Sequence, residues 1–440
     1  MPLKALPILR SFFIAGFLLS SWLAACQNQP PTVSTSPPTD TPTTSTLVST
    51  PLFTATVPAR PRTAVPSCTV ASYVPTPDPS SLFPAVTAKD WVRGPITATV
   101  TIIEYADFQE VYGAALEPVL AELLKDFPND LQLVYRHLPL IGDPSQQPYP
   151  FHDKAALATQ AAEAAGRQGK FWEMHDILFN RQSEWRNESV DQFSDWVLAQ
   201  ASRLGLDVEK FKADLYSDEL KALAQQAWDT GYRLMKGIPS VPFIILNGEI
   251  WGGAPKTYDN FATIIRLYAL GARQYATCPP MTINPFTKYV ATLHTTKGDL
   301  VIQLFPDKAP MAVNNFIFLA RNGWFDGVMF HTVVPGLLAQ TGDPSATGYG
   351  GPGYAFSNEV SDLKFDREGV VAMANSGLDS NGSQFFITYA PVPDMDGMYT
   401  IFGQLISGMD VLKQLTPRNP TQGGPLSQGD VILGVEILEK

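Results

Sequence analysis

A tract rich in Thr, Pro and Ser near the N-terminus most constrains what this chain can fold into. Residues 27–66 contain 11 Thr, 9 Pro and 4 Ser, and their only charged residues are Asp40, Arg60 and Arg62. Such a tract cannot bury enough apolar surface to offset the entropy lost on ordering it. We therefore expect an extended, mobile tether over 27–85, with the folded domains after it.

The composition of the whole chain excludes several classes of protein. With 440 residues, of which 45% are hydrophobic, the chain is long enough for two or three domains with real cores. The net charge of −11 disfavours binding to phosphate backbones, so no nucleic-acid partner is expected. Three cysteines and five histidines show no metal-ligand spacing, so we expect neither a metal nor another cofactor.

The first 26 residues have the layout of an export signal. Lys4 and Arg10 precede an apolar run that ends in Leu-Ala-Ala-Cys26. This ending resembles the lipobox of bacterial lipoproteins, which implies cleavage before Cys26 and acylation of that cysteine. The alternative is an ordinary signal peptide with an incidental cysteine. The resemblance predicts a protein anchored to the outer face of the cell membrane, with its lipid as the only membrane contact.

The region from residue 86 to 275 alternates strands with helices. Residues 97–107 and 130–137 are rich in β-branched and aromatic residues and predict two strands. Between them Leu116, Val119, Leu120 and Leu123 repeat at helical spacing. Residues 152–235 are mostly helical in pattern, after which a Val-Pro pair introduces another strand.

This order resembles the thioredoxin fold, in the bacterial disulfide-oxidoreductase branch with an inserted helical domain. The residues that carry the resemblance are IIEYADFQ (102–109), KFWEMH (170–175) and Ser-Val-Pro242. In that family the proline that matches Pro242 is cis and faces the redox site.

The family's Cys-x-x-Cys is missing from its place. Residues 110–113 read Glu-Val-Tyr-Gly, and no cysteine occurs between residues 69 and 277. Because exchange requires a thiolate at that position, thiol–disulfide chemistry by this domain is excluded. Glu110 is a favourable residue for a helix N-terminus, because its negative charge interacts well with the helix dipole. The alternative interpretation is a catalytic role for Glu110. A groove near Pro242 that holds extended peptide could remain.

Cys68 and Cys278 flank this domain. In an oxidising compartment they are the one intramolecular pair available once Cys26 is acylated, so we expect a disulfide between them. The alternative is two free thiols.

The C-terminal region predicts an antiparallel β-structure. Residues 289–293 and 299–305 alternate around a turn, which indicates a hairpin. Pro310 begins a helix in which Val313, Phe316, Ile317 and Ala320 have helical spacing. Short strands punctuated by Gly, Pro, Asn and Asp follow, which is typical of a barrel.

The segments 297–331, VVPGLLAQTGDP (333–344) and GVVAMANSGLDSNGSQFFIT (369–388) resemble the cyclophilins. The resemblance implies an eight-stranded antiparallel barrel with two helices, and isomerisation of X-Pro bonds in polypeptides. It assigns a proline slot to five residues, namely Phe330, Leu338, Phe386, Met395 and Tyr399. It assigns backbone-holding polar groups to His331, Gln340 and Asn375. The alternatives are ordinary barrel core for Leu338 and Phe386, and satisfied turn or strand ends for Gln340 and Asn375.

One departure weakens the catalytic expectation. The family's catalytic arginine follows the Phe-His pair, where this chain has Thr332, and a hydroxyl supplies no fixed charge. The domain's arginines, Arg321, Arg367 and Arg418, are distant from these motifs in sequence. Two hypotheses follow: a slow isomerase that assists folding of exported proteins, or a chaperone or scaffold that binds peptide without catalysis.

The sequence thus predicts a multidomain protein. Its expected parts are a signal peptide (1–26), a tether (27–85), a thioredoxin-like domain without Cys-x-x-Cys (86–275), a linker (276–288) and a cyclophilin-like domain (289–440).

Overall fold

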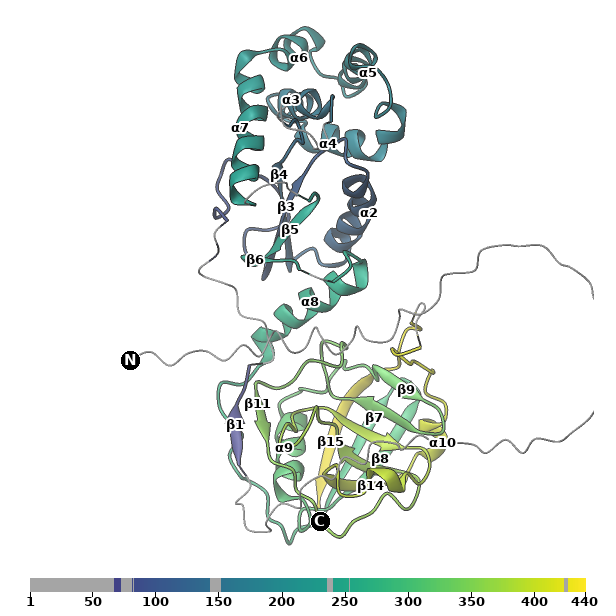
Figure 1. Cartoon of the computed structure of the whole chain (residues 1–440). Coiled ribbons are helices and arrows are strands. Elements are labelled where there is room, and N and C mark those ends of the chain that lie inside the picture. The colour runs from purple at the N-terminus through teal and green to yellow at the C-terminus, as the bar shows by residue number, and fades with distance from the viewer. Residues whose placement is uncertain are drawn as a thin grey trace, which may run out of the picture. The chain divides into compact units, whose positions relative to one another are not determined.

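The structure of the chain is a computed structural model (Figure 1). It describes residues 67–72, 81, 83–142, 152–235, 240–252, 254–422 and 426–440. The expected signal peptide, Cys26 and most of the expected tether lie outside these residues. Within them, no helix is both long enough and apolar enough to cross a membrane.

The first domain is built on a mixed sheet of five strands in the order β2-β4-β3-β5-β6. The strands are β2 (Trp91–Arg93), β3 (Val100–Ala106), β4 (Leu131–His137), β5 (Phe243–Leu246) and β6 (Glu249–Ile250). β3 and β4 are parallel, and the other pairings are antiparallel. The β-branched runs of the sequence thus become the central strands, buried on both faces.

Helices cover both faces of this sheet. On one face α2 (Val111–Asp126) and α8 (Tyr258–Leu270) pack over β3, β4 and β5 through buried residues that include Leu116, Leu120 and Phe261. The other face is covered by α7 (Asp218–Leu234), whose Trp228 packs with Ile103 and Val134. The expected repeat at Leu116, Leu120 and Leu123 is the buried stripe of α2.

A helical insertion separates β4 from β5. It consists of α3 (Ala155–Gly166), α4 (Phe171–Asn180), a 3₁₀ turn (Gln182–Glu184), α5 (Val190–Arg203), α6 (Val208–Leu215) and α7. The run of small residues in α3 lets α4, α6 and α7 approach it closely. A 3₁₀ turn (Gly271–Arg273) ends the domain after α8.

The second domain is an antiparallel sheet of eight strands in the order β15-β7-β8-β14-β12-β13-β10-β9. The strands are β7 (Tyr289–Thr295), β8 (Gly298–Leu304), β9 (Thr332–Val334), β10 (Leu338–Thr341), β12 (Val370–Met373), β13 (Phe385–Thr388), β14 (Ile401–Ser407) and β15 (Ile432–Glu439). A bridge between Met329 and Val431 joins the segments that lead into the edge strands β9 and β15. The sheet therefore curls into a barrel, as the sequence predicted.

Two helices accompany the barrel, α9 (Pro310–Arg321) and the short α10 (Met409–Leu412). The apolar face of α9 is buried at Val313, Phe316 and Ile317. The ring of Phe316 lies 5.4 Å from that of Phe385 and 5.5 Å from that of Phe402, which places α9 against the barrel core.

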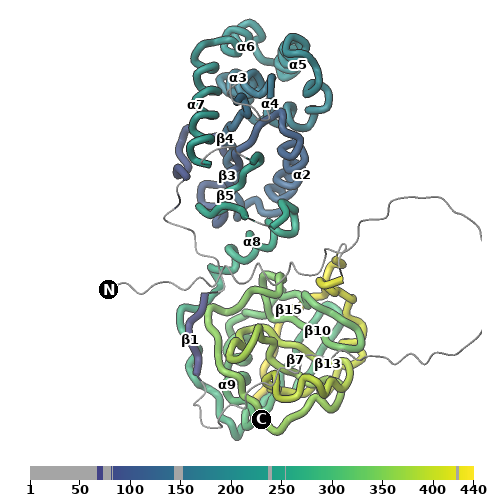
Figure 2. The backbone as a smooth tube through the Cα atoms, viewed as in Figure 1, coloured from purple at the N-terminus to yellow at the C-terminus, as the bar shows by residue number. Residues whose placement is uncertain are grey.

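A short strand from the expected tether completes this domain. β1 (Cys68–Val70) pairs with β11 (Tyr354–Phe356), and Figure 2 shows β1, in purple, beside the green part of the barrel. Cys68 and Cys278, the pair expected to be bridged, form a disulfide with an S–S distance of 2.07 Å.

The expected tether and linker boundaries were therefore wrong. Besides β1, residues 83–85 also belong to a folded domain, because Arg136 donates hydrogen bonds to the carbonyls of Pro84 (2.8 Å) and Ala85 (3.0 Å). In the expected linker, Ile283 is buried in the barrel core and the Thr282 N–H donates to Asn314 Oδ1 at 2.8 Å. These segments order because they satisfy polar groups of the domains, which their own composition does not reveal.

Candidate functional site

One row of side chains crosses the outer face of the barrel. Thr332 of β9 is the Cα partner of Gln340 in β10, Gln340 is the partner of Phe386 in β13, and Phe386 is the partner of Ala372 in β12. Residues directly opposite in antiparallel strands point to the same face of the sheet. The register therefore places a hydroxyl, an amide and an aromatic ring next to one another.

The apolar part of the site surrounds Phe386. Its ring is 2% exposed, stacks on Phe365 at 5.9 Å and meets Tyr399 edge-on at 5.3 Å. Leu338 and Met395 pack against the same cluster and remain partly exposed. Four of the five expected slot residues thus form one apolar surface.

Phe330 was wrongly assigned to this slot. Its side chain is fully buried in the barrel interior, with Phe316, Phe385 and Phe402, and not in the Phe386 cluster. Phe330 precedes β9 and packs inward with Phe316, Phe385 and Phe402, whereas Phe386 packs in the outer cluster with Phe365 and Tyr399.

The polar part of the site is a pair of glutamines. Gln340 Nε2 donates to Gln384 Oε1 at 2.8 Å, and Gln384 Nε2 donates to the carbonyls of Gly348 (3.0 Å) and Gly350 (2.9 Å). Gln384 was not predicted. It precedes Phe386 by two residues and so shares its face of the sheet, a signal that the sequence already contained.

Asp343 fixes the glycine-rich loop 348–353 through hydrogen bonds to its backbone. Its carboxylate accepts hydrogen bonds from the N–H groups of Gly348 (2.8 Å) and Gly350 (3.0 Å). A Cβ on Gly350 would lie 2.0 Å from Asp343 Oδ1, which explains the glycine. Because these amide groups are already bonded to a carboxylate, the loop does not offer them to a phosphate.

His331 and Asn375 lie outside the row of side chains that runs from Thr332 to Phe386. His331 is buried, and burial lowers its pKa while the carboxylate of Asp343 opposes the shift, so its ring is neutral at pH 7. Its Cδ2 lies 3.7 Å from the position of a Cβ on Gly348, beneath the loop. Asn375 Oδ1 accepts from the N–H of Gly377 at 3.3 Å and so orders the following turn.

Thr332 stands at the position of the family's arginine, and the charged side chain nearest to consider is that of Arg418. Arg418 exchanges backbone hydrogen bonds with Val333 at 2.6 and 2.9 Å, so it does neighbour β9 in space. However, this pairing puts its side chain on the Val333 face, opposite to Thr332. Its Nη1 donates to the Ser427 carbonyl at 2.6 Å. Arg418 therefore does not replace the missing charge.

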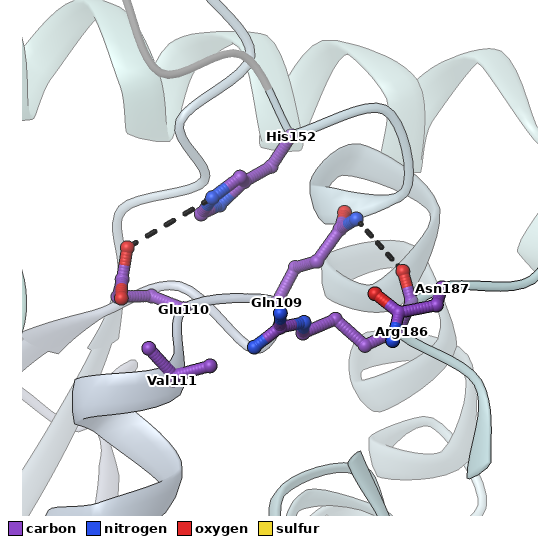
Figure 3. Close-up of a pocket in the computed structure, with 6 residues that line it drawn as sticks. All are labelled: Gln109, Glu110, Val111, His152, Arg186 and Asn187. Carbon is purple, nitrogen blue, oxygen red and sulfur yellow. Dashed lines mark hydrogen bonds and ion pairs between the residues drawn. The ribbon is translucent and has the colours of Figure 1, made fainter. Parts of the chain in front are cut away.

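In the first domain, the place of the absent cysteines is a polar cavity of about 240 Å³ at the start of α2 (Figure 3). It is lined by Gln109, Glu110, Val111, His152, Arg186 and Asn187. Glu110 is the N-cap of α2 and accepts from the Tyr112 N–H at 3.3 Å, as a helix-starting residue does.

His152 is oriented in this cavity by two carboxylates. Its Nδ1 lies 2.9 Å from Asp107 Oδ2, and its Nε2 lies 3.8 Å from Glu110 Oε2. Burial lowers the pKa of His152, but the hydrogen bond that its ring donates to Asp107 and the negative charges of Asp107 and Glu110 outweigh this and raise the pKa. The Val241–Pro242 bond is cis, as the resemblance implied. The described lining of the cavity provides the Glu110 carboxylate and the His152 imidazole, and the two described cysteines, Cys68 and Cys278, are joined to each other elsewhere.

Comparison with known families agrees with both domains. The family "Cyclophilin type peptidyl-prolyl cis-trans isomerase/CLD" matches residues 290–437, and the family "Thioredoxin" matches residues 87–266. The chain therefore combines a thioredoxin-like domain with a cyclophilin-type domain.

Individual relatives specify the second domain. Peptidyl-prolyl cis-trans isomerase CYP18-1 of Arabidopsis thaliana is 46% identical over 30% of this chain and 84% of its own length. Peptidyl-prolyl cis-trans isomerase cypE of Dictyostelium discoideum is 39% identical over 33% of this chain and 96% of its own. The chain belongs to the cyclophilin-type peptidyl-prolyl cis-trans isomerase family.

Other relatives are matched over a smaller share. The chain covers 28% of the length of peptidyl-prolyl cis-trans isomerase-like 2 of Cryptococcus neoformans, at 41% identity over 35% of this chain. A solved cyclophilin type peptidyl-prolyl cis-trans isomerase of Cryptosporidium parvum is 34% identical, covers 35% of this chain and 98% of its own, and gives a TM-score of 0.32.

Proposed function

We propose that this protein catalyses cis–trans isomerisation of peptide bonds that precede proline in polypeptide substrates. The observation that carries the proposal is the joint placement of Gln340, Gln384 and Phe386 on one outer face of the barrel. The family membership of the domain supports it.

This arrangement suits the chemistry of X-Pro rotation. The barrier is about 18–20 kcal/mol, because amide resonance is lost in the twisted state, and no covalent bond breaks. An apolar surface at Phe386 can hold the pyrrolidine ring. The Gln340 amide, itself fixed by Gln384, can hold a flanking carbonyl while the bond turns. Neither a nucleophile nor a proton-transfer base is required.

The test is an isomerisation assay with X-Pro peptides on the purified full chain. Gln340→Ala should lower kcat/KM by about 10-fold or more, since one positioned hydrogen-bond group is lost. Gln303→Ala, at an exposed site on β8, is the matched control and should leave the rate unchanged. Equal rates for both variants would contradict the assignment of Gln340.

A second function, binding of proline peptides without turnover, is favoured by Thr332. The site retains its apolar surface and its glutamines, but Thr332 stands in this row where the family has its arginine. Peptide binding in calorimetry, together with no rate above the uncatalysed exchange, would establish this function instead.

We also propose that the protein acts on exported polypeptides at the cell envelope, anchored through a lipid on Cys26. The sequence Leu-Ala-Ala-Cys26 after an apolar run supports this. Mass spectrometry of the mature N-terminus should find an acylated Cys26, and Cys26→Ser should release the protein from membranes or leave it unprocessed. An unmodified N-terminus at another residue would contradict the anchor.

A further inference from the structure

Two segments outside the region matched by the cyclophilin family contact the glycine-rich loop 348–353 of the isomerase site. The first is residues 67–71, which contain β1, and the second is residues 274–278, which follow the last turn of the thioredoxin-like domain. The disulfide between Cys68 and Cys278 joins the two segments. Figure 1 shows β1 beside β11, the strand that continues from the loop. The chain therefore contacts this loop both before and after the thioredoxin-like domain.

Three consecutive carbonyl groups of the loop, those of residues 351–353, accept hydrogen bonds from these segments. The donors, in the same order, are Gln274 Nε2 (3.1 Å), the Tyr275 N–H (2.8 Å) and the Ala71 N–H (2.9 Å). The approach is close at its last residue, because a Cβ on Gly353 would lie 2.5 Å from the carbonyl oxygen of Tyr275. The loop and the two segments are thus fitted to each other along the backbone.

The composition of the loop explains why it depends on bonds from outside. Four of the six residues 348–353 are glycines. Glycine loses more conformational freedom on ordering than any other residue, so such a loop is ordered only where its backbone groups find partners. Asp343 accepts from N–H groups in the first half of the loop, and the two segments donate to the carbonyl groups of the second half.

The same loop fixes the amide of Gln384 in the row of site residues. Gln384 Nε2 donates to the carbonyls of Gly348 and Gly350, and its Oε1 accepts from Gln340. The carbonyl held by Gln384 at Gly350 and the carbonyl held by Gln274 at residue 351 are neighbours in the chain. A shift of the loop would therefore move the Gln384 amide, and with it the partner that orients Gln340.

The two segments are attached to the barrel in different ways. The ring of Tyr275 lies 5.0 Å from that of Phe318 in α9, so the second segment packs against the domain. The first has less support from packing, since two of the three residues of β1 are exposed. Its attachment comes mainly from backbone pairing with β11 and from the disulfide to Cys278. Loss of the disulfide should therefore loosen β1 and the loop together.

We propose that residues 67–71 and 274–278, joined by their disulfide, position the glycine-rich loop, and through it the two glutamines of the row, for binding of the substrate peptide. Gln274 is a positioning residue, because it acts on the row through the loop. The inference rests on the proposed function, since it concerns the same site. The peptide site thus depends on parts of the chain that lie outside the cyclophilin family's region.

The test separates KM from kcat in the isomerisation assay on the purified full chain. Gln274→Met keeps the length of the side chain but cannot donate a hydrogen bond, so KM should rise by about 2–10-fold, the equivalent of one hydrogen bond. A looser loop weakens binding of the planar and the twisted amide alike, so kcat should change little. Gln274→Lys retains a donor and should keep the KM of the wild type. Partial unfolding would instead lower the apparent kcat and leave KM unchanged.

Gln404→Met is the matched control. Gln404 Nε2 also donates to a backbone carbonyl of the barrel domain, that of Glu368 at 2.9 Å, which is outside the loop, so KM should be unchanged. Reductant should raise the KM of the wild type to that of the double variant Cys68→Ser/Cys278→Ser, which should not respond to it. An equal rise in KM for Gln404→Met, a Gln274→Lys variant as weak as Gln274→Met, or a wild-type KM that ignores reductant would overturn the proposal.

Hydrogen exchange of the loop gives a readout that does not require turnover. The N–H groups of Gly348 and Gly350 donate to Asp343, so they should exchange faster in Gln274→Met than in the wild type, and at the wild-type rate in Gln404→Met. If the wild type shows no rate above the uncatalysed one, the proposed function fails, whereas loop exchange and peptide affinity in calorimetry still decide this inference. Unchanged exchange and affinity in Gln274→Met would overturn it.

Discussion

The clearest test of the isomerase site is to restore the missing charge with Thr332→Arg. Thr332 lies on the edge strand β9 and is partly exposed, so a longer side chain can be accommodated. Its Cα partner is Gln340, one strand spacing away at about 5 Å, and Phe386 follows at about 10 Å. An arginine at this position would therefore extend along the row toward the place where the substrate amide twists.

The size of the effect follows from the distance and the exposure of the site. A unit charge about 4 Å from a developing charge contributes about 4 kcal/mol at the effective dielectric of a protein surface. Only the part that differs between the planar and twisted amide speeds the reaction. One preorganised group is typically worth 10²–10³ in rate in an enclosed site, so at this open one we expect kcat/KM to rise by about 10–10³-fold.

The assay is the rate of X-Pro isomerisation, with peptide affinity measured in parallel. Thr332→Met is the control for side-chain size, and Thr332→Lys is the control for charge without the planar fork of donors. The gain should follow the order Arg, Lys, Met. If Arg gives no gain while the fold and peptide binding are intact, or if Met gives the same gain, the electrostatic reasoning is refuted.

Three further predictions concern the same domain and its disulfide. Phe386→Ala should weaken proline-peptide binding as well as stability, whereas Phe385→Ala, on the inward face, should lower stability by a similar ~3–5 kcal/mol and leave affinity per folded molecule unchanged, as calorimetry and thermal melts would reveal. Replacing Cys68 and Cys278 by Ser should lower the free energy of unfolding by at most about 5 kcal/mol, because the disulfide closes a long loop in the unfolded chain. In denaturant unfolding, reductant should lower the stability of the wild type and leave that of the double variant unchanged. Since burial lowers the pKa of His331, the unfolded state takes up the proton first, so stability should fall as the pH drops below about 6.5, and the unfolding free energy of His331→Gln should show a flatter pH dependence in that range.

The elements of the fold that could be predicted are those that follow from short-range patterns in the sequence. The hairpin of β7 and β8 and the helix α9 follow from alternation, a turn and Pro310. The stripe of α2 follows from helical periodicity. In these elements each residue's environment depends mainly on its near neighbours in the chain.

The parts that could not be predicted depend on contacts between distant segments. β1 is a strand only because β11 offers it an edge, and its three residues have no pattern of their own. Phe330 and Phe386 are both aromatic residues, and only their packing in the folded domain shows that they lie in different clusters.

Thr332 leaves two functions open, an isomerase and a module that binds proline peptides without turnover. Measuring peptide affinity and the isomerisation rate separately distinguishes them. Groups that contact the planar and twisted amide equally contribute to affinity, whereas a charge that acts on the twisted nitrogen contributes to rate. The Phe386 surface and the Gln340–Gln384 pair belong mainly to the first kind, and both are in place. The arginine belongs to the second kind. Its absence should therefore lower kcat while peptide affinity is maintained, so an isomerase and a peptide-binding module would differ in turnover alone. A wild-type protein that fails to bind proline peptides would contradict both.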